Sequence, residues 1–120
     1  MSNFLNSSPE YHREHIEQEL QAADTAELDA LVTIYHADHR EICAHEKDWP
    51  FEIVNVLEIL ADSMGIQRSD RYKELKMMQN VEAVLEDCHE LLKKHSVDPE
   101  LARSEIEKMI WDQPLPLNQT

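Results

Sequence analysis

The most apolar stretch of the chain runs from Trp49 to Met64 and reads WPFEIVNVLEILADSM. Its apolar side chains cover nearly every side of a helix and leave only a narrow polar stripe, which is the pattern of a helix buried in a core. Asp48 can cap such a helix, Pro50 suits its first turn, and Gly65 suits the left-handed position after its end. The pattern therefore predicts a central helix over about residues 50–64.

A buried strand is the alternative for the same stretch. β-Branched residues favour strands, and four of them lie here: Ile53, Val54, Val56 and Ile59. The length of the stretch and the capping residues at both ends favour the helix. We therefore expect a helix, with a strand as the competing interpretation.

Capping residues also mark the first two helices. Ser8, Pro9 and Glu10 are a cap, a first-turn proline and an acid in the expected order, and they predict a helix from Pro9 to about Ala23. Its apolar seam is thin, so most of it should face solvent. Asp24 then resembles the start of a capping box, so the first helix is expected to continue through a kink or a second one to begin and run to about His45.

Two more helices are expected in the C-terminal half. Ser69 or Asp70 can cap a long helix that reaches about Lys94, because apolar residues repeat at helical spacing along it. Asp98, followed by a proline and a glutamate, begins a fifth helix to Trp111. The sequence thus predicts an all-α domain over residues 1–120, a bundle of four to five helices around the apolar helix at about 50–64. Residues 1–7 and 113–120 are expected to be loosely ordered tails.

The net charge of −14 lies mainly in the N-terminal half. Residues 1–65 hold 14 acidic and 3 basic residues, whereas residues 66–120 hold 11 acidic and 8 basic ones. Such a field repels nucleic acid and anionic lipid, and it accelerates encounter with a basic surface in a salt-dependent way. Acidity can also serve solubility alone. Direct binding of nucleic acid or of a membrane is therefore not expected.

The two cysteines and the N-terminus bear on the cellular compartment. Cys43 and Cys88 lie in apolar helical stretches with no C-x-x-C spacing, so free thiols are expected. The first ten residues, MSNFLNSSPE, contain no basic region and no apolar run, so no signal peptide is expected. The sequence predicts a cytoplasmic protein.

Histidines beside carboxylates are the only hint of a metal site. A carboxylate di-metal bundle needs a Glu-x-x-His pair on each of two helices, and this chain shows one such spacing. Surface histidines on an acidic helix are the favoured interpretation, so neither a metal nor another cofactor is expected. The weak candidate ligands are His36, His39, Glu86 and His89.

Catalysis finds little support in the sequence. A chain with one glycine cannot form a glycine-rich phosphate loop or a G-x-S-x-G nucleophile turn. Cys88 and His89 are adjacent, but adjacent side chains on a helix point about 100° apart. Carboxylates are frequent everywhere, so none is singled out. No enzymatic activity is therefore expected.

The sequence predicts a non-catalytic, acidic helical protein that docks on another protein and inhibits or modulates it. A basic surface, such as that of a nucleic-acid-binding regulator or enzyme, is the expected partner. Acidic residues would form the face and two aromatic residues the anchors; the candidates are Phe4, Glu10, Tyr11, Glu14, Glu17, Asp24 and Asp29. Three alternatives stay open: a small acidic chaperone for a secreted or folding client, a His/carboxylate metal-binding bundle, and a homodimer that completes one core from two copies.

Overall fold

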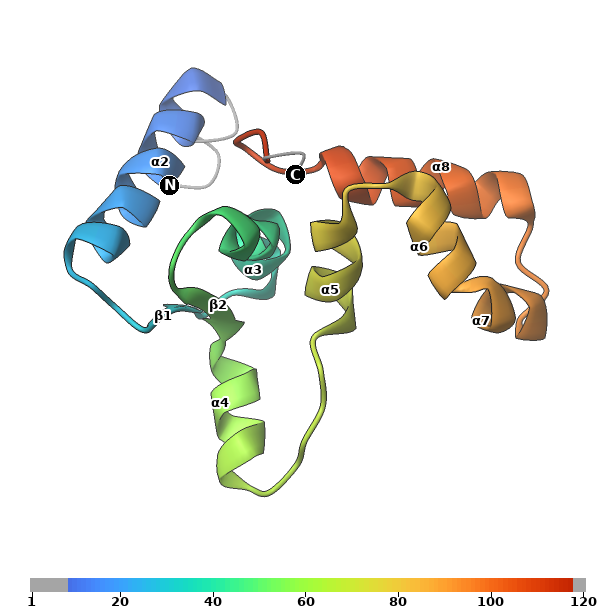
Figure 1. The fold of residues 1–120 in the computed structure, drawn as a ribbon, viewed down its shortest axis with the longest axis horizontal. Coiled ribbons are helices and arrows are strands. Elements are labelled where there is room, and N and C mark those ends of the chain that lie inside the picture. The colour runs from blue at the N-terminus through green and yellow to red at the C-terminus, as the bar shows by residue number, and fades with distance from the viewer. Residues whose placement is uncertain (1–8, 118–120) are drawn as a thin grey trace.

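The computed structural model describes residues 9–117, which form helices and one two-stranded parallel sheet (Figure 1). The predicted predominance of helix is confirmed, and the first and fifth predicted helices are present. The elements in chain order are α2 (Pro9–Thr25), β1 (Ala30–Thr33), α3 (His36–Ile42), the 3-10 helix η1 (Cys43–Asp48), β2 (Glu52–Asn55), α4 (Val56–Ser63), α5 (Arg71–Met78), α6 (Val81–Asp87), α7 (His89–Lys94) and α8 (Pro99–Trp111).

The helix predicted from Asp24 to His45 is wrong. Helix α2 ends at Thr25, and Glu27 adopts a left-handed conformation with φ 54°, so the chain turns before β1. Residues 30–33, ALVT, then pair with β2 as a strand. The apolar residues here follow helical spacing, but two adjacent β-branched residues, Val32 and Thr33, fit a sheet better than a helix.

The central helix predicted over residues 50–64 is also wrong. Residues 52–55 form β2, which lies parallel to β1 with Leu31 opposite Ile53 and Thr33 opposite Asn55. The competing strand interpretation is correct for these four residues. Only residues 56–63 are helical, in α4, and none of them is buried. The most apolar stretch of the sequence is therefore divided between a sheet and an exposed helix.

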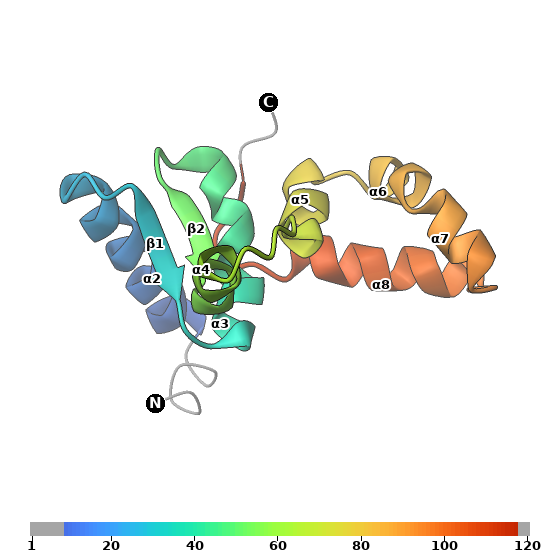
Figure 2. The ribbon, with the colours of Figure 1, turned by 90° about the horizontal axis from the view of Figure 1, so that it is seen from below.

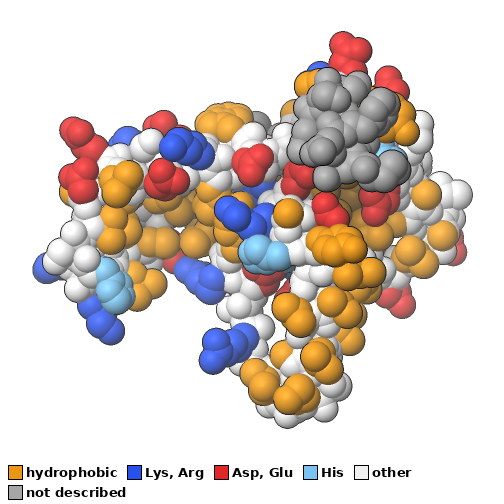
Figure 3. Space-filling model, turned by 180° about the vertical axis from the view of Figure 1, so that it is seen from behind, with side chains coloured by type: hydrophobic (Ala, Val, Ile, Leu, Met, Phe, Trp, Pro, Cys, Tyr) orange, Lys and Arg blue, Asp and Glu red, His pale blue; other side chains and the backbone are white. Residues whose placement is uncertain are grey.

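Helix α4 projects away from α2 and α3 (Figure 1). The projection is one reason why the radius of gyration is 15.7 Å, compared with about 13.6 Å for a compact 120-residue domain. Hydrophobic side chains are visible along this limb (Figure 3). The exposed large apolar residues of α4 and the link after it are Val56, Leu57, Ile59, Leu60, Met64 and Ile66.

The main core lies where α2, α3 and η1 meet the sheet (Figures 1 and 2). One face of α2 is buried there, and β2 contributes Ile53, which is fully buried. Trp49 and Leu115 pack against this core while staying partly exposed, and Leu117 near the C-terminus is buried. The buried residues of the core are Ile16, Leu20, Ala23, Ile42, Cys43, Phe51 and Ile53.

The long helix predicted to reach Lys94 is three helices. Asp70 caps α5 as expected, but Gln79 is left-handed with φ 50° and Asn80 caps a new helix, α6. A second break at Cys88 separates α6 from α7. Helix α6 packs against α8, where Val84, Ala102 and Ile110 are buried.

Two smaller predictions can be compared with the structure. Both cysteines are free thiols, as expected. Across residues 9–117, no helix is both long enough and apolar enough to cross a bilayer.

Candidate functional site

The two parallel strands end side by side at Thr33 and Asn55, and polar side chains gather at that edge. The carboxyl ends of parallel strands are a common place for ligand sites. The Thr33 hydroxyl accepts a hydrogen bond from Asn55 Nδ2 at 3.2 Å and donates one to the Val54 carbonyl at 3.3 Å. It also lies 3.0 Å from His39 Nδ1. A buried polar network therefore joins both strands to α3.

His39 is the centre of this network, with only 4% of its surface exposed. The Thr33 hydroxyl lies closer to Nδ1 of His39, at 3.0 Å, than to the Val54 carbonyl, at 3.3 Å, and its single proton can be donated to either. The other ring nitrogen, Nε2, lies 2.6 Å from Asp70 Oδ2. The ring is thus fixed from both sides.

Asp70 connects the network to α5. Its Oδ1 accepts a hydrogen bond from the Lys73 backbone N–H and caps the helix. Burial by itself would raise the pKa of Asp70, but the hydrogen bonds from His39 and Lys73 outweigh it and hold the pKa below its ordinary value. Asp70 is therefore an anionic partner of His39 at neutral pH.

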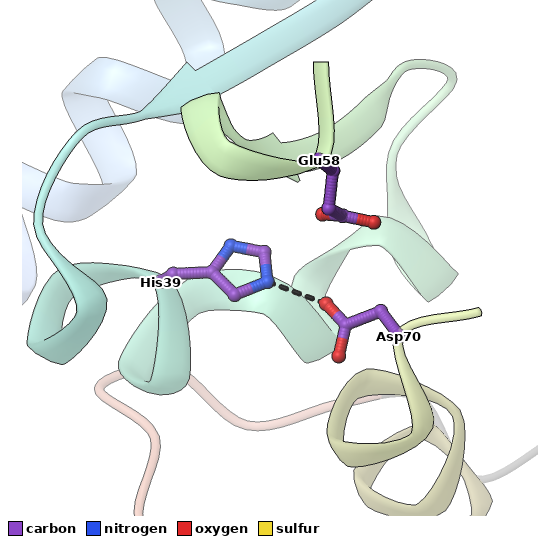
Figure 4. A group of neighbouring side chains, drawn as sticks. All are labelled: His39, Glu58 and Asp70. Atoms are coloured by element: carbon purple, nitrogen blue, oxygen red, sulfur yellow. Dashed lines mark hydrogen bonds and ion pairs between the residues drawn. The ribbon is translucent and has the colours of Figure 1, made fainter. Parts of the chain in front are cut away.

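Glu58 completes a three-residue cluster with His39 and Asp70 (Figure 4). One ligand atom from each of the three residues lies within 4.8 Å of the other two. Glu58 Oε2 accepts a hydrogen bond from the Asn55 backbone N–H at 3.0 Å and forms a capping box at the start of α4. The cluster therefore draws on α3, α4 and the start of α5.

An open pocket of about 460 Å³ lies beside the cluster, and Glu58 and Asp70 line it. Lys73 on its wall donates to Glu46 Oε1 at 2.9 Å and to the Ile53 carbonyl at 3.0 Å. Burial would lower the pKa of Lys73, but the Glu46 carboxylate outweighs it and raises that pKa. Lys73 is thus paired with Glu46, and the carboxylates of Glu58 and Asp70 in the cluster also favour its charged form.

Of the four weak metal candidates in the sequence, the structure brings only His39 into such a cluster. His36 is exposed at the start of α3, and Glu86 and His89 are exposed on α6 and α7. Among residues 9–117, His39, Glu58 and Asp70 are the single group with this geometry. No spacing signal in the sequence points to this group, because its three residues lie 12 to 31 positions apart.

The structure does not bring all residues of the predicted acidic face together. Glu10, Glu14 and Glu17 are exposed on α2, and the first two lie on the side away from its buried residues. Tyr11 stacks on His15 with ring centroids 6.5 Å apart. Phe4 lies outside the described residues. Glu17 and half-buried Asp24 line a shallow hollow next to Trp49, whereas exposed Asp29 lies just before β1.

A groove that the sequence did not reveal lies between α2, the end of β1 and α3. We call it the α2–α3 groove; it encloses about 310 Å³. Its apolar lining includes Ile34 and Tyr35, each 71% exposed, and neither Lys nor Arg lines it. His12 on α2 hydrogen-bonds Glu41 on α3 across it. Its lining residues are His12, His15, Ile16, Glu19, Val32, Thr33, Ile34, Tyr35, Asp38, Glu41 and Ile42.

No protein-family model, no curated protein and no solved structure matches this chain.

Asn55 ties the strand edge to α4, and its replacement tests that link. Its Oδ1 caps α4 through the Leu57 N–H, and its Nδ2 donates to Thr33. We expect Asn55→Ala to lower the free energy of unfolding by about 1–2 kcal/mol, because a cap and a buried hydrogen bond are lost together. Asn55→Ser keeps a capping oxygen and should cost less. Urea denaturation measures both, and equal losses would mean that the cap contributes nothing.

Proposed function

We propose that the protein is a non-catalytic binding protein that holds a basic, amphipathic segment of another protein in the α2–α3 groove. The observation that carries this proposal is the chemistry of the groove, which apolar side chains and carboxylates line together. Ile34 and Tyr35 leave most of their surface to solvent, and large exposed apolar side chains that lie together are typical of interfaces. The carboxylates are Glu19, Asp38 and Glu41.

The charge of the groove favours a cationic partner. Its three carboxylates are accompanied by His12 and His15 but by no Lys or Arg. The net charge of the chain, −14, adds a long-range field of the same sign. Because Glu41 is already paired with His12, a Lys or Arg side chain of the partner would pair with Glu19 or Asp38 while an apolar neighbour packs on the apolar lining.

This proposal keeps the function predicted from the sequence and moves its site. The predicted carboxylates Glu10 and Glu14 lie on the solvent side of α2, whereas Glu19 and Asp38 border the groove. Such a protein would inhibit or modulate its partner by covering a basic surface. We further propose that it acts in the cytoplasm, where its free thiols stay reduced.

Charge reversal tests the site. We expect the double variant Glu19→Lys/Asp38→Lys to weaken binding of the partner recovered from native extract by about tenfold or more, because it removes two contacts made at close range. The matched variant Glu10→Lys/Glu14→Lys changes the net charge equally on the other side of α2. It should slow association slightly and leave dissociation unchanged. Surface plasmon resonance with the purified partner at two salt concentrations measures both rates.

Two outcomes would count against the groove. Equal losses in both double variants would show that net charge alone attracts the partner. No loss in either, combined with a loss in Leu57→Asp on the exposed face of α4, would favour the acidic chaperone instead, since that alternative needs an exposed apolar surface.

A further inference from the structure

We propose that His39, Glu58 and Asp70 form a binding site for a divalent first-row transition-metal ion. The proposal concerns a different part of the molecule from the α2–α3 groove and does not depend on it. Three side chains that carry suitable ligand atoms converge from α3, α4 and the start of α5 (Figure 4). Imidazole nitrogen with two carboxylates is a ligand set that such ions accept.

The hydrogen bonds around His39 are those of a metal-binding histidine. In such sites the ring nitrogen that does not bind the ion donates to a neighbouring oxygen, which fixes the tautomer and the ring orientation. Here the Thr33 hydroxyl lies 3.0 Å from Nδ1, where it can accept the Nδ1 proton once Nε2 binds an ion, and it is itself held by Asn55 and the Val54 carbonyl. Nε2 is the nitrogen that faces Asp70, and Glu58 brings a carboxylate oxygen to the same group. The supporting network is therefore complete before any ion binds.

The carboxylates need little movement to become ligands. Glu58 uses Oε2 in its capping box, and among the described residues no donor binds its Oε1. His39 Nε2 and Asp70 Oδ2 are 2.6 Å apart. Two ligands bound at about 2.1 Å must lie roughly 3.0–3.5 Å apart, so this pair opens by less than about 1 Å. The ion takes the place of the proton between them, which is released to solvent.

The set of ligand atoms favours one class of ion. Mg²⁺ and Ca²⁺ prefer oxygen ligands alone, so an imidazole in the set favours Zn²⁺, Mn²⁺ or Fe²⁺. The neighbouring pocket leaves room for water to complete the coordination. Two cations, Arg68 and Lys73, also line that pocket; Lys73 is paired with Glu46, and a bound ion would compete with it for the charge of Glu58 and Asp70.

Binding at this site would join α4 to the rest of the protein. Glu58 lies in the first turn of α4, and Asp70 caps α5 at the other end of the intervening link. An ion shared with His39 would fix both ends of the segment from residue 58 to residue 70. We therefore expect hydrogen exchange in this segment to slow when the ion is added.

Calorimetric titration of the full chain with ZnCl₂ tests the site. We expect one equivalent to bind the wild type, and Glu58→Gln to weaken binding by about tenfold or more, because a neutral amide oxygen replaces a ligand carboxylate. The amide oxygen of this variant can still accept the Asn55 N–H, so the fold should persist. Thr33→Val should also weaken binding, by removing the support of Nδ1. MgCl₂ should bind far more weakly.

Control variants distinguish zinc binding at this site from zinc binding at exposed histidines and carboxylates. Glu74→Gln changes another glutamate of the same pocket, and His36→Gln changes an exposed histidine; both should bind like the wild type. Slower exchange of residues 58–70 on addition of ZnCl₂ should disappear in Glu58→Gln. The proposal is overturned if wild type and Glu58→Gln bind equally, if His36→Gln alone abolishes binding, or if the wild type binds no ion at millimolar concentration. None of these results bears on the α2–α3 groove.

Discussion

Replacing Lys76 by methionine is expected to lower the free energy of unfolding by about 3 kcal/mol, since charge-assisted hydrogen bonds contribute roughly 1.5–3 kcal/mol each. Lys76 is fully buried, with 0% of its surface exposed. Its Nζ donates to the Arg40 carbonyl at 2.7 Å and to the Asp112 carbonyl. These carbonyls lie at the C-terminal ends of α3 and α8, where a cation is favoured. One ammonium group therefore joins α3, α5 and α8.

Part of the stability that Lys76→Met loses is regained, because the variant buries no charge. Burial lowers the pKa of Lys76, which shows that taking its charge out of water has a cost that methionine avoids. The two carbonyls are nevertheless left without their donor. Guanidinium chloride denaturation measures the difference, and Lys108→Met, which alters an exposed lysine paired with Glu105, is the control. A loss below about 1 kcal/mol for Lys76→Met would mean that the carbonyls find other donors.

The wild type should lose about 2 kcal/mol of stability, relative to His45→Gln, when the pH falls from 7.5 to 5. His45 has 1% of its surface exposed, and its Nε2 is buried with no hydrogen-bond partner among residues 9–117. Burial, assisted by the charge of Lys76, lowers the pKa of His45 from 6.5 to about 4. The folded protein therefore holds this ring neutral at a pH where the unfolded chain protonates it.

The sign of this change in stability with pH follows from proton binding. Between pH 6.5 and about pH 4 the unfolded state binds more protons at His45 than the folded state, so stability falls as the pH is lowered through this window. Glutamine cannot titrate and should remove the dependence. His36→Gln, which changes an exposed histidine, should retain it. Urea denaturation across the pH range measures the difference, and parallel profiles for the wild type and His45→Gln would contradict the assignment.

Helix starts could be predicted from the sequence more reliably than helix ends. The caps at Asp70 and Asp98 and the left-handed Gly65 are as expected. Three other turns place left-handed residues without glycine: Glu27, Gln79 and Ser96. Since the chain has a single glycine, no glycine in the sequence marks the helix ends near these three residues. Helical periodicity also continues through β1 and through the break at Gln79.

The candidate sites depend on contacts that no local pattern encodes. The sequence indicates His39 as a candidate, but its partners Glu58 and Asp70 lie in segments whose patterns predict a buried helix and a helix start. Their convergence requires the strand pairing of Thr33 with Asn55, which the predicted helices excluded. The α2–α3 groove was missed for the same reason, because Ile34 and Tyr35 follow a strand.

The exposure of helix α4 affects how quickly proteases would degrade the protein. An eight-residue helix is marginal in water, and this one buries none of its residues, so its capping box at Asn55 and Glu58 supplies much of what keeps it formed. Its far end can therefore unravel while the main core remains intact. Proteases cleave such locally opened segments first. The rate of degradation would then be governed by the fraying of residues 60–68, and not by the unfolding of the whole protein.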